Sequence, residues 1–179
     1  MKNATHLTAI AATLLAIVTV FPLQASADEE HQALFEMVIV GNRASGDLVS
    51  KGHYQKAVDR ITGVYSGYPF ASATNLCTAL SMLDKFEQAE PHCDEAIKLA
   101  NKSPKPAPRS WKARNQLATQ RALAYSNRGV MRILSGDASG AEEDFRMAIE
   151  RKADLRAPTQ NLARVQFETT GPIVAKVSQ

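Results

Sequence analysis

Pairs of small residues twelve positions apart recur along the chain and constrain its fold more than any single motif. The pairs are Ser45/Ala57, Cys77/Ala89 and Gly129/Ala141. A bulkier residue follows each pair after four further positions, and a small or branched residue follows after seven. Steps of three, four and seven mark one face of an α-helix. The pattern therefore predicts helices that fold back on each other closely, as a stack of antiparallel hairpins.

The composition after residue 27 favours an all-α fold. This part is rich in alanine and charged helix formers and has no alternating β-branched runs, and aromatic residues make up only 6% of the chain. It is long enough for one domain with its own core. Residues 28–40 form a lead-in to this domain. Within it, the apolar run Met37–Val40 before Gly41 leaves helix and extended chain both open, and we favour a short extended or irregular segment.

The helical domain is expected to span residues 41–168. Its three hairpins and its C-terminal capping helix are expected at 41–69, 70–100, 118–153 and 156–168. Pro69 should stop the first hairpin, Pro91 should bend a helix without ending it, and Ser110 should cap the long helix that ends at Leu134. A basic, proline-rich insertion occupies 101–117, and residues 169–179 form a tail.

The first 27 residues have the pattern of a cleaved signal peptide. Lys2 precedes the uncharged run Leu7–Val20, Pro22 follows it, and Ala25-Ser26-Ala27 offers small residues for cleavage. The run is shorter than the roughly 20 residues that span a bilayer. We therefore expect a periplasmic or secreted protein. The alternative is that this segment is retained as a membrane anchor.

Three sets of residues resemble the tetratricopeptide repeat family. They are Tyr125–Gly129 with Gly136, Asp137, Ala141, Phe145 and Ala148; Leu76, Leu80, Phe86, Ala89 and Ala96; and, more weakly, Gly52, Tyr54, Ala57 and Pro69. The first two units are 32 residues apart instead of the family's usual 34, and about eighteen extra residues separate the second unit from the third. The resemblance implies a right-handed superhelix with a concave groove for a peptide or partner protein. It implies no chemistry.

The groove residues follow from the helix faces together with this resemblance. In the second unit, three hydroxyl side chains lie opposite the face that meets the hairpin partner, and the resemblance places them in the groove. The full set of candidate groove residues is Thr74, Thr78, Ser81, Ser126, Val130 and Ile133. We expect a non-enzymatic scaffold or adaptor that binds a protein or an extended peptide there. The alternatives are a self-associating structural protein, or an accessory subunit of an envelope enzyme.

Charge is distributed unevenly along the chain. Residues 28–95 carry eleven acidic and five basic side chains, whereas residues 96–136 carry nine basic side chains and no acidic one. The candidate basic patch is Lys102, Lys105, Arg109, Lys112, Arg114 and Arg121. An acidic protein, anionic lipid headgroups or plain solvation are each compatible with it. Nucleic acid is not expected, because only Trp111 and Tyr125 are near for stacking and the signal peptide indicates export.

No catalytic or metal-binding pattern is present in the sequence. His31, His53 and His92 are scattered, and none has a second ligand four positions on. No serine lies in a Gly-x-Ser-x-Gly elbow, and no glycine-rich loop precedes a helix. We therefore expect neither an enzyme nor a cofactor.

Cys77 and Cys93 are the only cysteines, and both belong to the second hairpin. Each is expected on the face where the two helices meet, which suits the Cα separation of about 4.4–6.8 Å in disulfides. Export to an oxidising compartment would preserve the bond. We predict a structural disulfide; two buried free thiols are the alternative.

Overall fold

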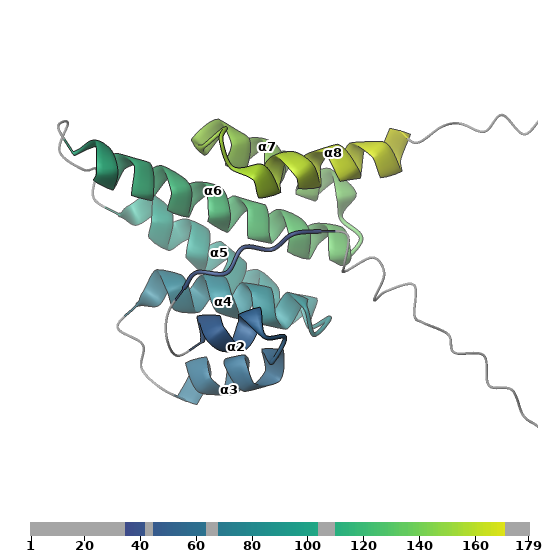
Figure 1. Cartoon of the computed structure of the whole chain (residues 1–179). Coiled ribbons are helices and arrows are strands. Elements are labelled where there is room, and N and C mark those ends of the chain that lie inside the picture. The colour runs from purple at the N-terminus through teal and green to yellow at the C-terminus, as the bar shows by residue number, and fades with distance from the viewer. Residues whose placement is uncertain (1–34, 42–44, 64–67, 104–109, 171–179) are drawn as a thin grey trace, which may run out of the picture.

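Helices are the only regular elements in the described part of the chain. The computed structural model describes residues 35–41, 45–63, 68–103 and 110–170 (Figure 1). Its helices are α2 (Gly46–Ser50), α3 (Tyr54–Gly63), α4 (Pro69–Ser81), α5 (Phe86–Lys102), α6 (Trp111–Leu134), α7 (Ala138–Arg151) and α8 (Arg156–Thr170). The all-α prediction is confirmed. The expected signal peptide and residues 171–179 of the tail lie outside the described residues.

Three helix pairs, α2/α3, α4/α5 and α6/α7, are joined by turns of one geometry. Each turn contains one residue with positive φ, which is Gly52 (72°), Asp84 (55°) or Gly136 (91°). In every turn the N–H of this residue donates to the C=O three positions back, and the next N–H donates to the C=O five positions back, at 2.8–3.1 Å. This is the Schellman arrangement, which ends a helix and reverses the chain. The two helices of each pair are consequently antiparallel and in contact.

Several helix boundaries differ from those predicted. Pro69 is the first residue of α4 and does not end the preceding unit, because proline at this position loses only an N–H that has no intrahelical partner. The expected insertion 101–117 is helical at both of its ends, since α5 continues to Lys102 and α6 begins at Trp111. Ser110 precedes α6 but makes no side-chain capping bond. Pro91 lies inside α5, as predicted.

The small residues spaced twelve apart lie in the core. Ala57, Ala89 and Ala141 are fully buried, and Gly129 is buried in α6. A Cβ atom on Gly129 would stand 2.7 Å from Cε1 of Phe145, so only glycine lets α6 and α7 approach this closely. Helix α4 is the central element. It contacts α2, α3, α5 and α6, and most of its side chains are buried.

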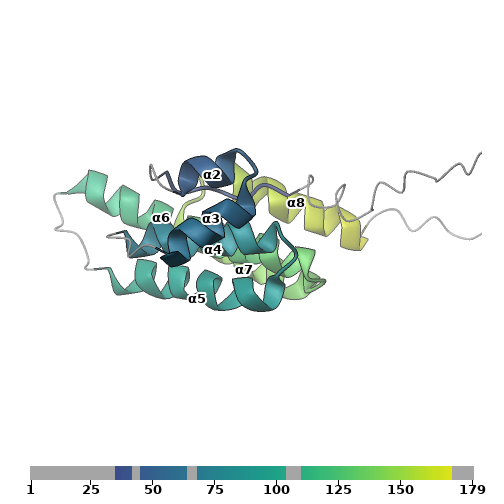
Figure 2. The same cartoon turned by 90° about the horizontal axis from the view of Figure 1, so that it is seen from below.

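An extended segment and α8 complete the architecture. Helix α8 packs on α7 and α6. Residues 35–41, which we call the lead segment, run past α8, α6 and α4 (Figure 1). Seen from below, α2 and α8 lie toward one face of the molecule and α5 toward the opposite face (Figure 2). The extended or irregular conformation that we favoured over a helix for Met37–Val40 agrees with the structure, as no residue of 35–41 is helical.

Candidate functional site

Three buried asparagines, one on each of three helices, bind the lead segment. Asn75 on α4 and Asn161 on α8 have no exposed surface, and Asn127 on α6 is 1% exposed. Buried amides require hydrogen-bond partners, since an unpaired buried polar group costs about 1–3 kcal/mol. All three amides find these partners in the backbone of the lead segment.

Each asparagine makes a two-way contact with one residue of the segment. The N–H of Val38 donates to Oδ1 of Asn127 (2.8 Å), and Nδ2 of Asn127 donates to the C=O of Val38 (2.7 Å). Asn161 binds Glu36 in the same way at 3.0 and 2.8 Å, and Asn75 binds Val40 at 3.1 and 3.0 Å. The bound residues alternate, which is the period of extended chain. The three asparagines, which we call the asparagine ladder, therefore recognise backbone and not side chains.

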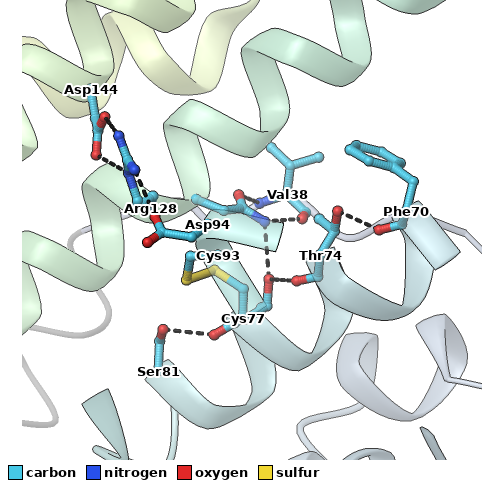
Figure 3. Close-up of a disulfide and its surroundings, with 11 residues drawn as sticks. Val38, Phe70, Thr74, Cys77, Ser81, Cys93, Asp94, Arg128 and Asp144 are labelled. Carbon is cyan, nitrogen blue, oxygen red and sulfur yellow. Dashed lines mark hydrogen bonds and ion pairs between the residues drawn. A yellow bond between two sulfur atoms is a disulfide. The ribbon is translucent and has the colours of Figure 1, made fainter. Parts of the chain in front are cut away.

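A second set of hydrogen bonds orients the ladder. The remaining Nδ2 donor of Asn127 reaches Oγ1 of Thr78 at 3.0 Å, and that hydroxyl donates to the C=O of Thr74 at 3.1 Å. Nδ2 of Asn75 likewise reaches Oγ of Ser45 at 3.1 Å. Figure 3 shows Val38 beside the turn of α4 that carries Thr74. Both amide hydrogens of Asn127 and of Asn75 are thus used, and each amide is held in one orientation.

Apolar side chains of the lead segment add to the protein core. Phe35 is 5% exposed and packs with Val130, Ile133, Phe145 and Val165. Met37 packs against two of the hydrophobic clusters, and Ile39 packs against the cluster that contains Val49. The segment is therefore held by apolar burial as well as by backbone hydrogen bonds.

The six predicted groove residues do not form an open surface. Thr74, Thr78, Ser81, Ser126, Val130 and Ile133 are all buried. The Thr74, Thr78 and Ser81 hydroxyls donate to backbone carbonyls one turn earlier in α4, and the chain's own lead segment covers Val130 and Ile133. The sequence analysis placed these side chains in a groove and did not recognise that residues 35–41 fill it.

The sequence analysis also missed the ladder, although a signal for it exists. Asn75 and Asn127 stand two positions before Cys77 and Gly129 of the hairpin pattern, and Asn161 stands two positions before Ala163. Asn127 and Asn161 are 34 residues apart, the usual tetratricopeptide period. A polar residue at a repeated position on a buried helix face indicates a repeated contact, and this observation would have identified the ladder.

A cavity remains beside the lead segment. It has a volume of about 440 Å³. The lead segment lines it with Phe35, Glu36, Met37 and Ile39. Helices α2 and α3 contribute Val49 and Tyr54, and α4 and its C-terminal end contribute Thr78 and Met82. Helix α8 contributes Arg156, Gln160 and Arg164. One wall is therefore mainly apolar and the opposite wall is cationic. We call this hollow the groove cavity.

Four of the six residues of the predicted basic patch lie within the described residues. Lys102, Lys112 and Arg114 are exposed near the facing ends of α5 and α6, and Nε of Arg121 donates to the C=O of Ala100 at 3.3 Å. Lys105 and Arg109 lie outside the described residues. The four described members of the patch do not line the groove cavity.

Two further arginines of the same basic stretch are used inside the protein. Asp144 of α7 is 1% exposed and binds both of them, Arg128 through two hydrogen bonds (2.7 and 2.9 Å) and Arg132 at 3.0 Å. Arg128 also binds Asp94 of α5 at 2.7 Å (Figure 3). Burial acts to lower the pKa of Arg128, but the bonds to Asp144 and Asp94 outweigh it and the net pKa is raised. These ion pairs connect α5, α6 and α7.

The structure contains the predicted disulfide between Cys77 of α4 and Cys93 of α5. The sulfur atoms are 2.13 Å apart, and the Cα atoms are 4.8 Å apart. Both residues are buried, in a cluster with Leu80, Ala89 and Met131. A disulfide at this site is compatible with an oxidising, exported compartment.

Reduction of this disulfide is expected to lower the free energy of unfolding by about 3 kcal/mol, because the bond closes a loop between residues 16 apart in sequence. Urea unfolding with and without dithiothreitol measures the effect. A Cys77→Ala/Cys93→Ala protein serves as the control, since its midpoint should not respond to the reductant. Equal midpoints for the oxidised and reduced wild-type protein would contradict the prediction.

Neither a metal-binding cluster nor a membrane-spanning helix is found among the described residues. No cluster of three or more histidine, cysteine or acidic side chains there is arranged to hold a metal ion. None of the described helices combines the length and the apolar character needed to cross a membrane. Neither a known protein family nor a curated protein nor a solved structure matches the chain.

Proposed function

We propose that this chain is an exported scaffold of the tetratricopeptide type, which binds an extended segment of a partner protein on its concave side. The three hairpins with identical turns support the repeat architecture. The buried disulfide supports a periplasmic or secreted location. The proposal assigns no catalytic step to the chain.

The asparagine ladder is the observation that carries this proposal. Three helices each present a buried amide to the same extended chain, and every contact is to backbone atoms. Repeated amides of this kind hold a polypeptide in extended form whatever its side chains are. The concave side is thus already built around one extended chain, and the groove cavity next to it has room for a further ligand.

The ion pairs favour an adaptor over the self-associating alternative. Head-to-tail assembly would require the acidic and basic halves of different copies to pair. Asp94 of the acidic half instead pairs with Arg128 of the basic stretch within one chain, and Asp144 binds Arg128 and Arg132. These charges are already paired inside each copy. The remaining alternative, an accessory subunit of an envelope enzyme, differs only in the activity of the partner. The photocrosslinking experiment described next identifies the partner and therefore tests this alternative as well.

Photocrosslinking in the native host tests the proposal. A photoreactive amino acid at Tyr54, which lines the groove cavity, is expected to capture a defined partner. The same amino acid at Glu90, exposed on α5, is the control, because α5 lies toward the opposite face (Figure 2). Adducts from Tyr54 and not from Glu90 are the expected result. Identical adducts from both positions, or none from Tyr54, would reject the concave side as the binding surface.

A further inference from the structure

We infer that the groove cavity receives an extended, carboxylate-bearing segment of the partner protein, which pairs as a strand with the free edge of the lead segment. The partner's carboxylates would lie beside Arg156 and Arg164. This inference rests on the proposed function and adds to it the position and the chemistry of the partner. The lead segment is then a permanent part of the binding surface to which the partner adds.

The lead segment has one satisfied edge and one free edge. Backbone groups of successive residues in an extended chain point to opposite sides. The ladder binds Glu36, Val38 and Val40, so the N–H and C=O groups of Met37 and Ile39 point away from it. No hydrogen bond within the described residues engages those groups. An unpaired row of this kind is a template for one further strand.

The cavity lies beside these two residues. Met37 and Ile39 both line it, and Val38 and Val40 do not. Its volume of about 440 Å³ is within the range of roughly 300–1,000 Å³ that ligand pockets occupy. Tyr54 and Met82 on the wall opposite α8 offer apolar contact to alternate side chains of an added strand. A free backbone edge and the space to pair with it therefore coincide.

The charge of the α8 wall selects the partner. Arg156 and Arg164 are exposed, line the cavity and form no ion pair within the described residues. Gln160 lies between them on the same face of α8. Guanidinium groups bind carboxylates through paired hydrogen bonds. Glu36 is the acidic side chain of the lining and opposes such a partner, but two arginines outnumber it.

Addition of a strand fits the structure better than displacement of the lead segment. Displacement would expose Phe35, which is 5% exposed and belongs to the core around Phe145. It would also leave the buried amides of the ladder without partners unless the incoming chain replaced every bond. Addition breaks none of these contacts.

A synthetic peptide tests the inference on the mature protein. The probe is a fluorescein-labelled hexapeptide of alternating valine and glutamate, blocked at both ends and measured by fluorescence anisotropy. Charge reversal by Arg156→Glu with Arg164→Glu is expected to weaken binding by about tenfold. Lys102→Glu with Lys112→Glu, an equal change in net charge at exposed positions outside the cavity, is expected to leave binding unchanged. Glu36→Gln should strengthen binding.

Peptide chemistry separates strand pairing from simple charge attraction. N-methylation of every second residue removes the donors along one edge of the peptide. Methylation in one register is expected to abolish binding, and methylation in the other register should not. The amide of Val38 should remain protected from hydrogen exchange in the complex, since its bond to Asn127 persists.

Each outcome decides the inference. Weaker binding by the Lys102/Lys112 variant in place of the arginine variant would assign the acidic partner to the basic patch. Equal binding of both methylated peptides, or loss of Val38 protection, would reject strand addition. None of these three results affects the Tyr54 photocrosslink, and the proposed function would therefore stand. Failure of that crosslink alone would reject the proposed function while peptide binding persisted.

Discussion

Replacing Asp144 with alanine is expected to destabilise the protein by about 3 kcal/mol, the lower end of the range for breaking a buried ion pair. Asp144 is 1% exposed and neutralises two arginines, whose side chains are 19% and 24% exposed. Without it, Arg128 retains Asp94 as an acidic partner, and Arg132 retains a longer contact of 3.8 Å to Asp137. The lower end applies because both guanidinium groups still reach solvent. Urea unfolding followed by circular dichroism measures the loss.

Two matched variants show whether the buried position is responsible. Asp144→Asn keeps the size and one acceptor oxygen and should lose less stability than Asp144→Ala. Glu95→Ala removes an exposed ion pair with Lys98, and such pairs contribute about 0–1 kcal/mol. If Glu95→Ala lowered the free energy of unfolding as much as Asp144→Ala does, the ion pairs between α5, α6 and α7 would stabilise the protein no more than an exposed ion pair.

Replacing Asn127 with aspartate is expected to release the lead segment and to lower stability by about 3 kcal/mol at neutral pH. Aspartate keeps the size of the side chain but loses the Nδ2 donors to the C=O of Val38 and to Oγ1 of Thr78. The new carboxylate would also be buried, which raises its pKa. Hydrogen exchange at Val38 should become faster than in the wild-type protein, and the urea midpoint should fall.

The pH dependence of this variant gives a second measurement. A carboxyl group with a raised native pKa costs stability at high pH, and the cost disappears as pH falls below its unfolded pKa of about 4. The variant should therefore approach the wild-type stability in acid. Asn115→Asp, at an exposed position of the same helix, is the control and should be nearly neutral. A pH-independent loss at Asn127 would show that burial of charge is not the cause.

Local patterns predicted much of the helical architecture. Steps of three and four residues predicted the helices, because this signal acts within one or two helical turns. Small residues marked where helix pairs touch, as Gly129 against Phe145 shows. The disulfide was also predictable, since Cys77 and Cys93 belong to one hairpin whose register the same pattern determines.

The groove and its occupant depended on contacts that no local pattern encodes. Bonds of the asparagine ladder join residues 35, 89 and 125 positions apart in sequence. An extended segment of seven residues has no periodicity that identifies the surface it will cover. Its apolar side chains favour burial against any apolar face, and only the assembled helices offer buried amides at matching intervals.

The sequence by itself determined that this chain folds into helices, where most of them turn, and which two cysteines pair, because helix faces and turns are decided over a few residues. Only the tertiary structure decided that residues 35–41 bind to α4, α6 and α8 and that Asp144 neutralises Arg128 and Arg132. Those contacts form between segments distant in the chain, and packing brings them together only after the helices have assembled.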